Sequence, residues 1–210
     1  MKILIFGASG KTGHHLVSQA LHRRYLVSAF VRDPSRLAIR DQNVKVFGGN
    51  VTDYQAVESA IKNQDAVLSA LGASGPFKRD FTLVNGIKNI VAAMQSQNVK
   101  RIIYQSYMGV TEHRDDFGLL INRIFPILIR NIIIDHESKE AIIEKSRLDW
   151  TIVRCPMLTN GPSQLHYRDG VRIRTDSMLP RISRADVAHF MINEIADTKY
   201  IRKTPRILNN

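Results

Sequence analysis

The feature that most constrains the fold is a glycine-rich loop near the start of the chain, Gly7-Ala8-Ser9-Gly10-Lys11-Thr12-Gly13. A short apolar segment, residues 2–6, precedes it, and residues 12–22 carry apolar side chains at helical spacing. Glycines between a strand and a helix permit a tight turn and let backbone N–H groups at the helix N-terminus approach a phosphate. The loop therefore predicts a phosphate-binding β-α unit.

The end of this loop also resembles another phosphate-binding motif. Gly10-Lys11-Thr12 matches the last residues of a nucleoside-triphosphate P-loop, which requires a glycine five positions before Gly10. Ile5 stands at that position. The spacing excludes the P-loop and leaves a dinucleotide phosphate as the expected ligand.

Apolar segments and helical patterns alternate along the rest of the chain. Strands are expected at residues 25–31, 44–47, 65–70, 101–105 and 150–154, and shorter ones at 171–173 and 206–208. Helices are expected at residues 52–62, 81–97, 135–146 and 183–196, the first capped by Thr52 or Asp53 and the last opened by a capping-box-like Ser183-Arg184-Ala185-Asp186. This order predicts an α/β fold with a doubly wound parallel sheet, as a single domain over residues 1–210.

Basic side chains follow the second expected strand. An acidic residue there would bind the ribose 2′-hydroxyl of NAD, whereas arginines can grip the 2′-phosphate of NADP with two N–H bonds. Arg32 stands at the strand end and Arg36 four residues later, which favours NADP. Asp33 keeps NAD open as the alternative, and Arg36 taken alone could be a solvated surface residue.

The chain resembles the atypical short-chain dehydrogenase/reductases. Within them it resembles the NmrA-like group that contains flavin reductase, also called biliverdin-IXβ reductase. The resemblance covers nearly the whole chain and rests on IFGASGKTG, VRDPSRL, GGNVTD, QDAVLSALG, GIKNIVAAM, LDWTIVRCPMLTNGP and ISRADVAHFM. It implies a Rossmann-like domain that binds NADP(H), with a short C-terminal portion on the substrate side.

The resemblance also implies roles for individual residues. The pyrophosphate would lie on Gly7, Ser9, Gly10, Lys11, Thr12 and Gly13, and the 2′-phosphate on Arg32 and Arg36. Asn50 and Val51 would flank the adenine, where the family usually has Asp-Val. The nicotinamide end would be approached by Leu71, Gly72, Cys155, Pro156, Met157 and Leu158, with the hydroxyl of Ser106 nearby. Met157 replaces a histidine of the biliverdin-reducing relatives, which argues against biliverdin more than against flavin.

The usual acid of the superfamily is missing. No tyrosine of the chain has a lysine four residues later, and Asp135 stands at the tyrosine position that Lys139 would define. Alcohol–ketone chemistry needs an acid within reach of the substrate oxygen, whereas a flavin or quinonoid acceptor delocalises the added charge. We therefore expect an NADPH-dependent reductase of such acceptors in which Ser106 orients the site; the alternative is an NADP(H)-sensing protein with little turnover.

Several other residues carry weaker predictions. Lys139 could bind the ribose or be a surface lysine, and Asp135 with His136 is expected to form a solvated helix start. Cys155 is expected to be a small buried residue rather than a redox centre. The segment 107–134, charged and then apolar, could be a substrate lid, a homodimer face or a helix packed on the body.

The formal net charge of +11 points to an anionic partner. Most of the excess lies in residues 1–105, with 14 Lys and Arg against 6 Asp and Glu, where the dinucleotide phosphates are expected. No nucleic-acid motif accompanies the charge, so a small anionic or planar substrate is the expected partner. One cysteine, no signal-peptide pattern and no apolar run of membrane-spanning length predict a cytoplasmic protein without a membrane span.

Overall fold

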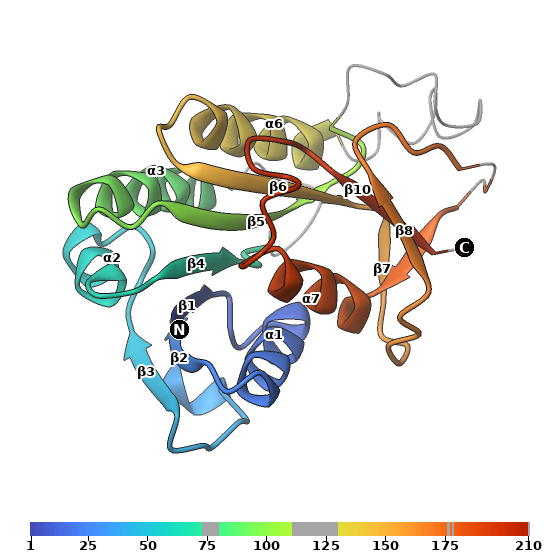
Figure 1. Ribbon diagram of the computed structural model, residues 1–210. Helices are drawn as coiled ribbons and strands as arrows, with labels where there is room; N and C mark the ends of the chain where they lie inside the picture. The colour runs from blue at the N-terminus through green and yellow to red at the C-terminus, as the bar shows by residue number, and fades with distance from the viewer. Residues whose placement is uncertain (73–79, 111–129, 176, 178, 210) are drawn as a thin grey trace.

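The apolar segments of the sequence form one eight-stranded sheet (Figure 1) in the computed structural model, which describes residues 1–72, 80–110, 130–175, 177 and 179–209. The strands follow the order β3-β2-β1-β4-β5-β6-β10-β8. Their bounds are β1 (Lys2–Phe6), β2 (Leu26–Val31), β3 (Val44–Gly48), β4 (Ala66–Ser69), β5 (Arg101–Tyr107), β6 (Asp149–Cys155), β8 (Tyr167–Gly170) and β10 (Arg206–Asn209). All these pairs are parallel except β10 with β8, so the expected doubly wound, Rossmann-like α/β fold is confirmed.

Helices cover both faces of this sheet. In Figure 1, α1 and α7 lie on one face, and α2, α3 and α6 lie on the other. The helices are α1 (Lys11–His22), α2 (Tyr54–Ile61), α3 (Phe81–Ser96), α6 (Arg130–Glu144) and α7 (Arg184–Asn193), with a short 3-10 helix, η1 (Pro34–Arg36). Residues Ile3 to Phe6 of β1 are fully buried between the layers, which explains their unbroken apolar run.

Side-chain caps fix where three of the helices begin. Asp53 accepts hydrogen bonds from two backbone N–H groups of α2, and Asp80 accepts one from Leu83 in α3. Ser183 accepts one from Asp186 at the start of α7. Each cap satisfies a donor that the first helical turn would otherwise leave unpaired. The start of α2 at Asp53 and of α7 at Ser183 agrees with the sequence-based expectation.

Three expectations about the second half of the chain are wrong. First, helix α6 begins at Arg130, five residues earlier than expected, so Asp135 lies in its second turn. Second, Asp135 is 2% exposed, whereas the sequence predicted a solvated residue. The short strand expected at 171–173 lies instead at Tyr167–Gly170, antiparallel at the sheet edge. The expected strands elsewhere differ from the observed ones by one or two residues at their ends. Residues 111–129 of the segment 107–134 fall outside the described residues.

A small second sheet follows β6 directly. Strands β7 (Met157–Thr159) and β9 (Arg181–Ser183) pair in parallel, and neither was expected from the sequence. The carboxylate of Asp186, at the start of α7, accepts hydrogen bonds from Ser163 Oγ and from the backbone N–H groups of Gln164 and Leu165. This buried carboxylate ties the loop after β7 to helix α7.

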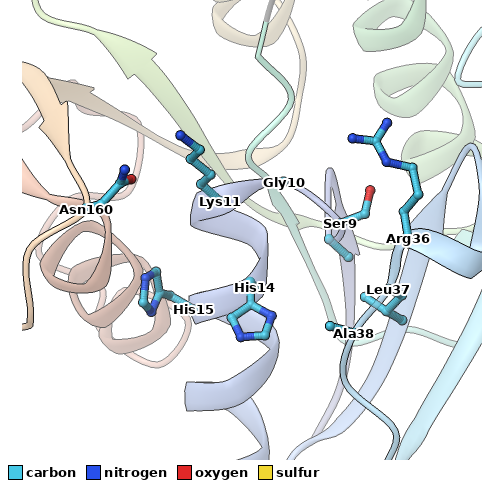
Figure 2. A pocket seen from close by; sticks show the side chains of 10 residues that line it. Ser9, Gly10, Lys11, His14, His15, Arg36, Leu37, Ala38 and Asn160 are labelled. Atoms are coloured by element: carbon cyan, nitrogen blue, oxygen red, sulfur yellow. The ribbon is translucent and has the colours of Figure 1, made fainter.

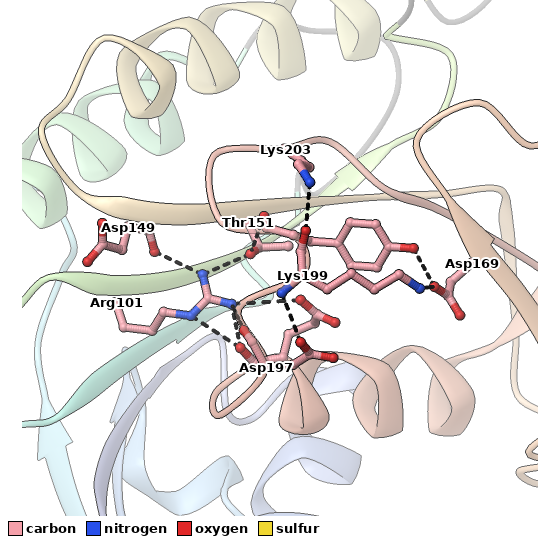
Figure 3. A network of polar contacts seen from close by, with 9 residues as sticks. Arg101, Asp149, Thr151, Asp169, Asp197, Lys199 and Lys203 are labelled. Carbon is pink, nitrogen blue, oxygen red and sulfur yellow. Dashed lines mark hydrogen bonds and ion pairs between the residues drawn. The ribbon is translucent and has the colours of Figure 1, made fainter.

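A polar network holds the opposite, amino edge of the sheet (Figure 3). The Arg101 guanidinium at the start of β5 donates to the backbone carbonyls of Asp149 and Glu194 and to Thr151 Oγ1. Its Nη2 also lies 3.8 Å from the Glu194 carboxylate. These contacts join the end of α7 to strands β5 and β6. Within the described parts of the chain, every helix is too short or too polar to cross a lipid bilayer.

Candidate functional site

The glycine loop takes a shape that side chains would obstruct. Gly7 has a φ of +78°, and a Cβ there would lie 2.8 Å from the Ala70 carbonyl oxygen at the end of β4. A Cβ on Gly13 would lie 2.0 Å from the carbonyl oxygen of Gly7. The loop is therefore pressed against the carboxyl edge of the sheet, where doubly wound folds bind their ligands.

The N-terminus of α1 differs from those of α2, α3 and α7. Gly10 occupies its N-cap position and no side chain caps the first turn. The carbonyl of Gly10 accepts the N–H of His14, so the helix starts regularly, while its first N–H groups have no side-chain partner. Unpaired N–H groups and the helix dipole favour an anion. The residues present thus fit a pyrophosphate at this turn.

An open cavity of about 380 Å³ curves around this helix end (Figure 2). Figure 2 shows Lys11 between Asn160, from the segment after β7, and Ser9 with Arg36 on the other side. The lining residues are Ala8, Ser9, Gly10, Lys11, His14, His15, Arg36, Leu37, Ala38 and Asn160. Of the other predicted phosphate-binding residues, Thr12 and Gly13 are buried in the first turn of α1. The cavity wall is basic, as a dinucleotide phosphate requires.

Several residues in and around the cavity had no predicted contact with the ligand, among them His14, His15, Asn160 and Arg184. His14 and His15 line it from α1, and Arg184 donates to Asn160 Oδ1 at 2.7 Å and to the Leu158 carbonyl at 3.2 Å. Burial, then the neighbouring His14 and Arg184, lower the pKa of His15, so His15 is held neutral. Helical spacing places His14 and His15 on the turn after the glycine loop, a signal present in the sequence.

The residues after β2 divide into two exposed arginines and a capping acid. Arg32 follows the last residue of β2 directly, and Arg36 ends η1 and lines the cavity. The Asp33 carboxylate accepts hydrogen bonds from the Ser35 backbone N–H at 3.0 Å and from its hydroxyl at 2.7 Å. Those bonds lower the pKa of Asp33. Asp33 thus caps η1 through its Oδ1.

The two residues predicted at the adenine have different environments. Asn50 is exposed, and its Oδ1 accepts the backbone N–H of Thr52 at 3.1 Å, which forms a local turn. Val51 is 5% exposed and lies against Gly86 of α3, where a Cβ would be only 2.5 Å from Val51 Cγ2. Val51 therefore packs the turn after β3 onto α3, while Asn50 faces outward.

The residues predicted at the nicotinamide end follow β4 and β6 at the carboxyl edge. Leu71 is half-buried and Gly72 is exposed, and both lie just before residues 73–79, which are not among the residues that the structure describes. Cys155 and Pro156 are buried, whereas Met157 is 40% exposed and Leu158 is half-buried. Burial raises the pKa of the Cys155 thiol well above its ordinary value, so a redox role gains no support.

Ser106, near the end of β5, belongs to a hydrogen-bonded cluster with α6 and β6. Its hydroxyl donates to Glu140 Oε1, and it lies 3.1 Å from His136 Nδ1. Arg154 Nη2 donates to Glu140 Oε2 at 2.6 Å. Burial raises the pKa of Glu140 and the bonds from Arg154 oppose that rise. His136 and Glu140 are four residues apart on one helix face, a spacing that could have revealed the pair.

Lys139 and Asp135 are buried beside this cluster, so a surface lysine and a solvated helix start are both wrong. Lys139 is 1% exposed, and its Nζ has no hydrogen-bond partner among the described residues. Asp135 Oδ2 accepts the backbone N–H of Asp80 at 2.7 Å. Burial lowers the pKa of Lys139, and the carboxylates of Asp135 and Asp80 oppose this. Lys139 is thus enclosed, and the residue four positions before it, Asp135, is a buried carboxylate.

The tyrosines near Ser106 are not activated acids. Burial raises the pKa of Tyr104 and that of Tyr107, whereas a tyrosine that transfers a proton near neutral pH needs a lowered pKa. Within the described residues no group of three His, Cys, Asp or Glu side chains could hold a metal ion. The arrangement offers a basic phosphate cavity and, along the same sheet edge, a hydroxyl–imidazole–carboxylate cluster.

The model of a family described as NAD(P)H-binding matches residues 7–198 of the chain. The chain belongs to this NAD(P)H-binding family. The match begins at Gly7 and extends over all the helices described above and over the strands from β2 to β9. It confirms the resemblance at the level of an NAD(P)H-binding, Rossmann-like group and confirms the expected dinucleotide.

Individual relatives of the family are distant in sequence. The chain is 27% identical over 221 residues to the UPF0659 protein YMR090W of Saccharomyces cerevisiae, covering all of this chain and 93% of the relative. It is 26% identical over 116 residues to the photosystem II assembly factor Ycf39 of Synechocystis, covering 54% of this chain and about a third, 36%, of that relative's length. A short-chain dehydrogenase/reductase of Veillonella parvula, solved in complex with NADP, has the same fold, with a TM-score of 0.78 at 22% identity over 98% of this chain and 93% of its own.

Proposed function

We propose that this NAD(P)H-binding protein is an NADPH-dependent oxidoreductase that transfers hydride to a flavin or a similar conjugated, quinonoid acceptor. The observation that carries the proposal is the lack of an activated acid among the described residues beside Ser106. Asp135 stands at the tyrosine position, and the pKa values of Tyr104 and Tyr107 are raised by burial. Reduction of a ketone would need such an acid, whereas a delocalised acceptor does not.

The preference for NADPH is supported by the residues after β2. Two exposed arginines stand where the 2′-phosphate would lie, and the only carboxylate between them is engaged by Ser35. Guanidinium groups bind phosphate with paired, charge-assisted hydrogen bonds. The NADP of the Veillonella parvula structure agrees with this choice.

The residues of this chain would bind and orient rather than exchange protons. The N-terminus of α1 with Lys11 would hold the pyrophosphate, and the residues after β4 and β6 would enclose the nicotinamide end. The bound dinucleotide supplies the hydride. Ser106 keeps the site oriented through its bonds to α6. If Ser106→Ala changed neither single-turnover hydride transfer nor the affinity for NADPH, this role would be wrong.

The cofactor preference is tested by binding. Arg36→Ala should weaken NADPH binding about tenfold or more, because a charge-assisted hydrogen bond is worth about 1.5–3 kcal/mol, and should leave NADH binding unchanged. Arg40→Ala is the matched control, since Arg40 is also an exposed arginine but does not line the cavity. Titration of nucleotide fluorescence gives each dissociation constant. Equal losses of NADPH and NADH affinity would contradict the assignment.

The acceptor is tested by following NADPH absorbance with FMN, riboflavin or a quinone present. We expect NADPH consumption that depends on the protein and on the acceptor. A folded, NADPH-saturated protein inert toward all three would refute the reductase and favour an NADP(H)-sensing role for the same cavity. Binding of nucleic acid that persists at saturating NADP would contradict a small anionic or planar substrate as the partner.

A further inference from the structure

The single hydroxyl proton of Ser106 is used in the hydrogen bond that Ser106 donates to Glu140. Glu140 accepts hydrogen bonds from Arg154 Nη2 at 2.6 Å and Nε at 3.2 Å, both to Oε2. A carboxylate paired in this way with a guanidinium is ionised and can only accept hydrogen bonds. The contact between Ser106 Oγ and Glu140 Oε1 therefore uses the serine proton, and Ser106 can only accept from any other neighbour.

The loss of the Ser106 proton to Glu140 favours one tautomer of His136. Nδ1 of His136 lies 3.1 Å from Ser106 Oγ and 3.4 Å from the Tyr104 hydroxyl. Since Ser106 has no proton left to give, the shorter contact, with Ser106, requires the proton on Nδ1, and the longer contact with Tyr104 is then not a hydrogen bond donated to Nδ1. Burial, then the nearby Lys139, lower the pKa of His136 to about 3, so the ring is neutral. A neutral ring with a proton on Nδ1 has a bare lone pair on Nε2.

The His136 residue lies at the carboxyl edge of the sheet, where the ligand is expected. Helix α6 leads into β6 and so runs opposite to the strands, which places its N-terminal turns at the carboxyl edge beside Ser106. Nδ1 points toward the two buried hydroxyls, so Nε2 lies on the opposite side of the half-buried ring. Within the described part of the chain, His136 has hydrogen bonds only through Nδ1.

We propose that His136 binds the hydride acceptor, and that its Nε2 accepts a hydrogen bond from an N–H group on the acceptor's ring. On an isoalloxazine this group is the imide N3–H, which rests on a flavin being the substrate as proposed above. Ser106 is then a positioning residue, because it holds the imidazole in the required tautomer, and Glu140 with Arg154 holds Ser106. His136 neither gives nor takes a proton in the reaction.

The binding test compares riboflavin with 3-methylriboflavin, which lacks the N3–H. With NADP⁺ present no turnover occurs, and quenching of flavin fluorescence gives both dissociation constants. Wild type should bind the methylated flavin about tenfold more weakly, because an acceptor that the bound flavin covers and leaves without a donor is costly. His136→Ala should lose this discrimination, and His136→Gln, which retains an acceptor, should keep part of it. His22→Ala, at an exposed histidine of α1, should discriminate like wild type.

The tautomer is tested separately by ¹⁵N chemical shifts of the His136 ring. Wild type should show the Nδ1–H form, and Ser106→Ala should populate the Nε2–H form, because the acceptor for Nδ1–H is gone. The Nε2–H form in wild type overturns the proposal. Equal affinity for both flavins, with riboflavin still reduced by NADPH, overturns it and leaves the proposed function intact. Failure of riboflavin to bind overturns this proposal, and it overturns the proposed function as well only if FMN and a quinone are also not reduced.

Discussion

Replacement of Gly13 by alanine tests whether the glycine loop is required by its geometry. The added Cβ would lie 2.0 Å from the Gly7 carbonyl oxygen and 2.7 Å from Ala8 Cα. Both contacts are to backbone, so no side-chain rotation can relieve them. Alanine would otherwise stabilise a helix position by about 1 kcal/mol relative to glycine. The clash opposes that gain, so the sign of the change in the free energy of unfolding shows which of the two effects is larger.

The expected change in the free energy of unfolding is the cost of the clash less the gain in helix propensity. Overpacking costs about 1–3 kcal/mol where neighbours can move, and a backbone clash lies at or above the upper end of that range. After the helix gain, Gly13→Ala should lose about 2 kcal/mol or more, which lowers the melting temperature by roughly 4–8 °C in a domain of this size.

The matched control is Gly72→Ala. A Cβ on Gly72 meets no atom of the described residues within 4 Å, so the free energy of unfolding of Gly72→Ala should differ from that of wild type by less than about 0.5 kcal/mol. Thermal unfolding followed by circular dichroism compares the two variants with wild type, and NADPH titration tests the same loop for binding. If Gly13→Ala were as stable as Gly72→Ala and bound NADPH like wild type, the reasoning about the close approach of Gly13 to Gly7 would be refuted.

Three further predictions concern buried groups. Burial, then Asp197, raise the pKa of Glu194 from 4.5 to about 7, so the free energy of unfolding falls as pH rises through that interval. The free energy of unfolding of Glu194→Gln should therefore exceed that of wild type by on the order of 1–3 kcal/mol at pH 8 and lose this advantage near pH 4. Urea unfolding at the two pH values measures the difference. Burial alone would raise the pKa of Asp186, but the hydrogen bonds that its carboxylate accepts outweigh burial and lower the pKa. Asp186→Asn should therefore reduce the free energy of unfolding by about 1.5–3 kcal/mol at pH 7 and by less as pH falls below 4. An equal reduction at pH 3 would argue against the hydrogen-bond network. Cys155 should resist iodoacetamide in the folded protein and react in urea, and rapid labelling of the native state would contradict its burial.

The prediction of elements succeeded where one physical signal dominated. The strand of residues 2–6, the glycine loop and the helix after it are local in sequence, and the structure has them with bounds within one residue. The start of α6 was missed because Arg130–Ile134 is rich in β-branched residues, which lowers helix propensity, and packing on α3 and β5 overrides that preference. The three-residue strands β7 and β9 are too short to show a periodic pattern.

The candidate site divides in the same way. Lys11 and Arg36 could be assigned to phosphates from their places after a strand, and both line one cavity. The contacts of Ser106 with His136 and Glu140 join residues 30 and 34 positions apart, and no spacing in the sequence brings them together. Asn160 reaches the cavity from still farther along the chain.

The sequence by itself determined that this chain forms a parallel sheet with a phosphate-binding turn after its first strand. Glycine spacing, apolar runs and caps are short-range features, and each limits the backbone directly. Tertiary structure alone decided the charge state and partners of the buried groups. Whether Lys139 is a surface cation or an enclosed one, and which nitrogen of His136 carries a proton, depend on the atoms that folding brings within hydrogen-bond distance and on the water that it removes.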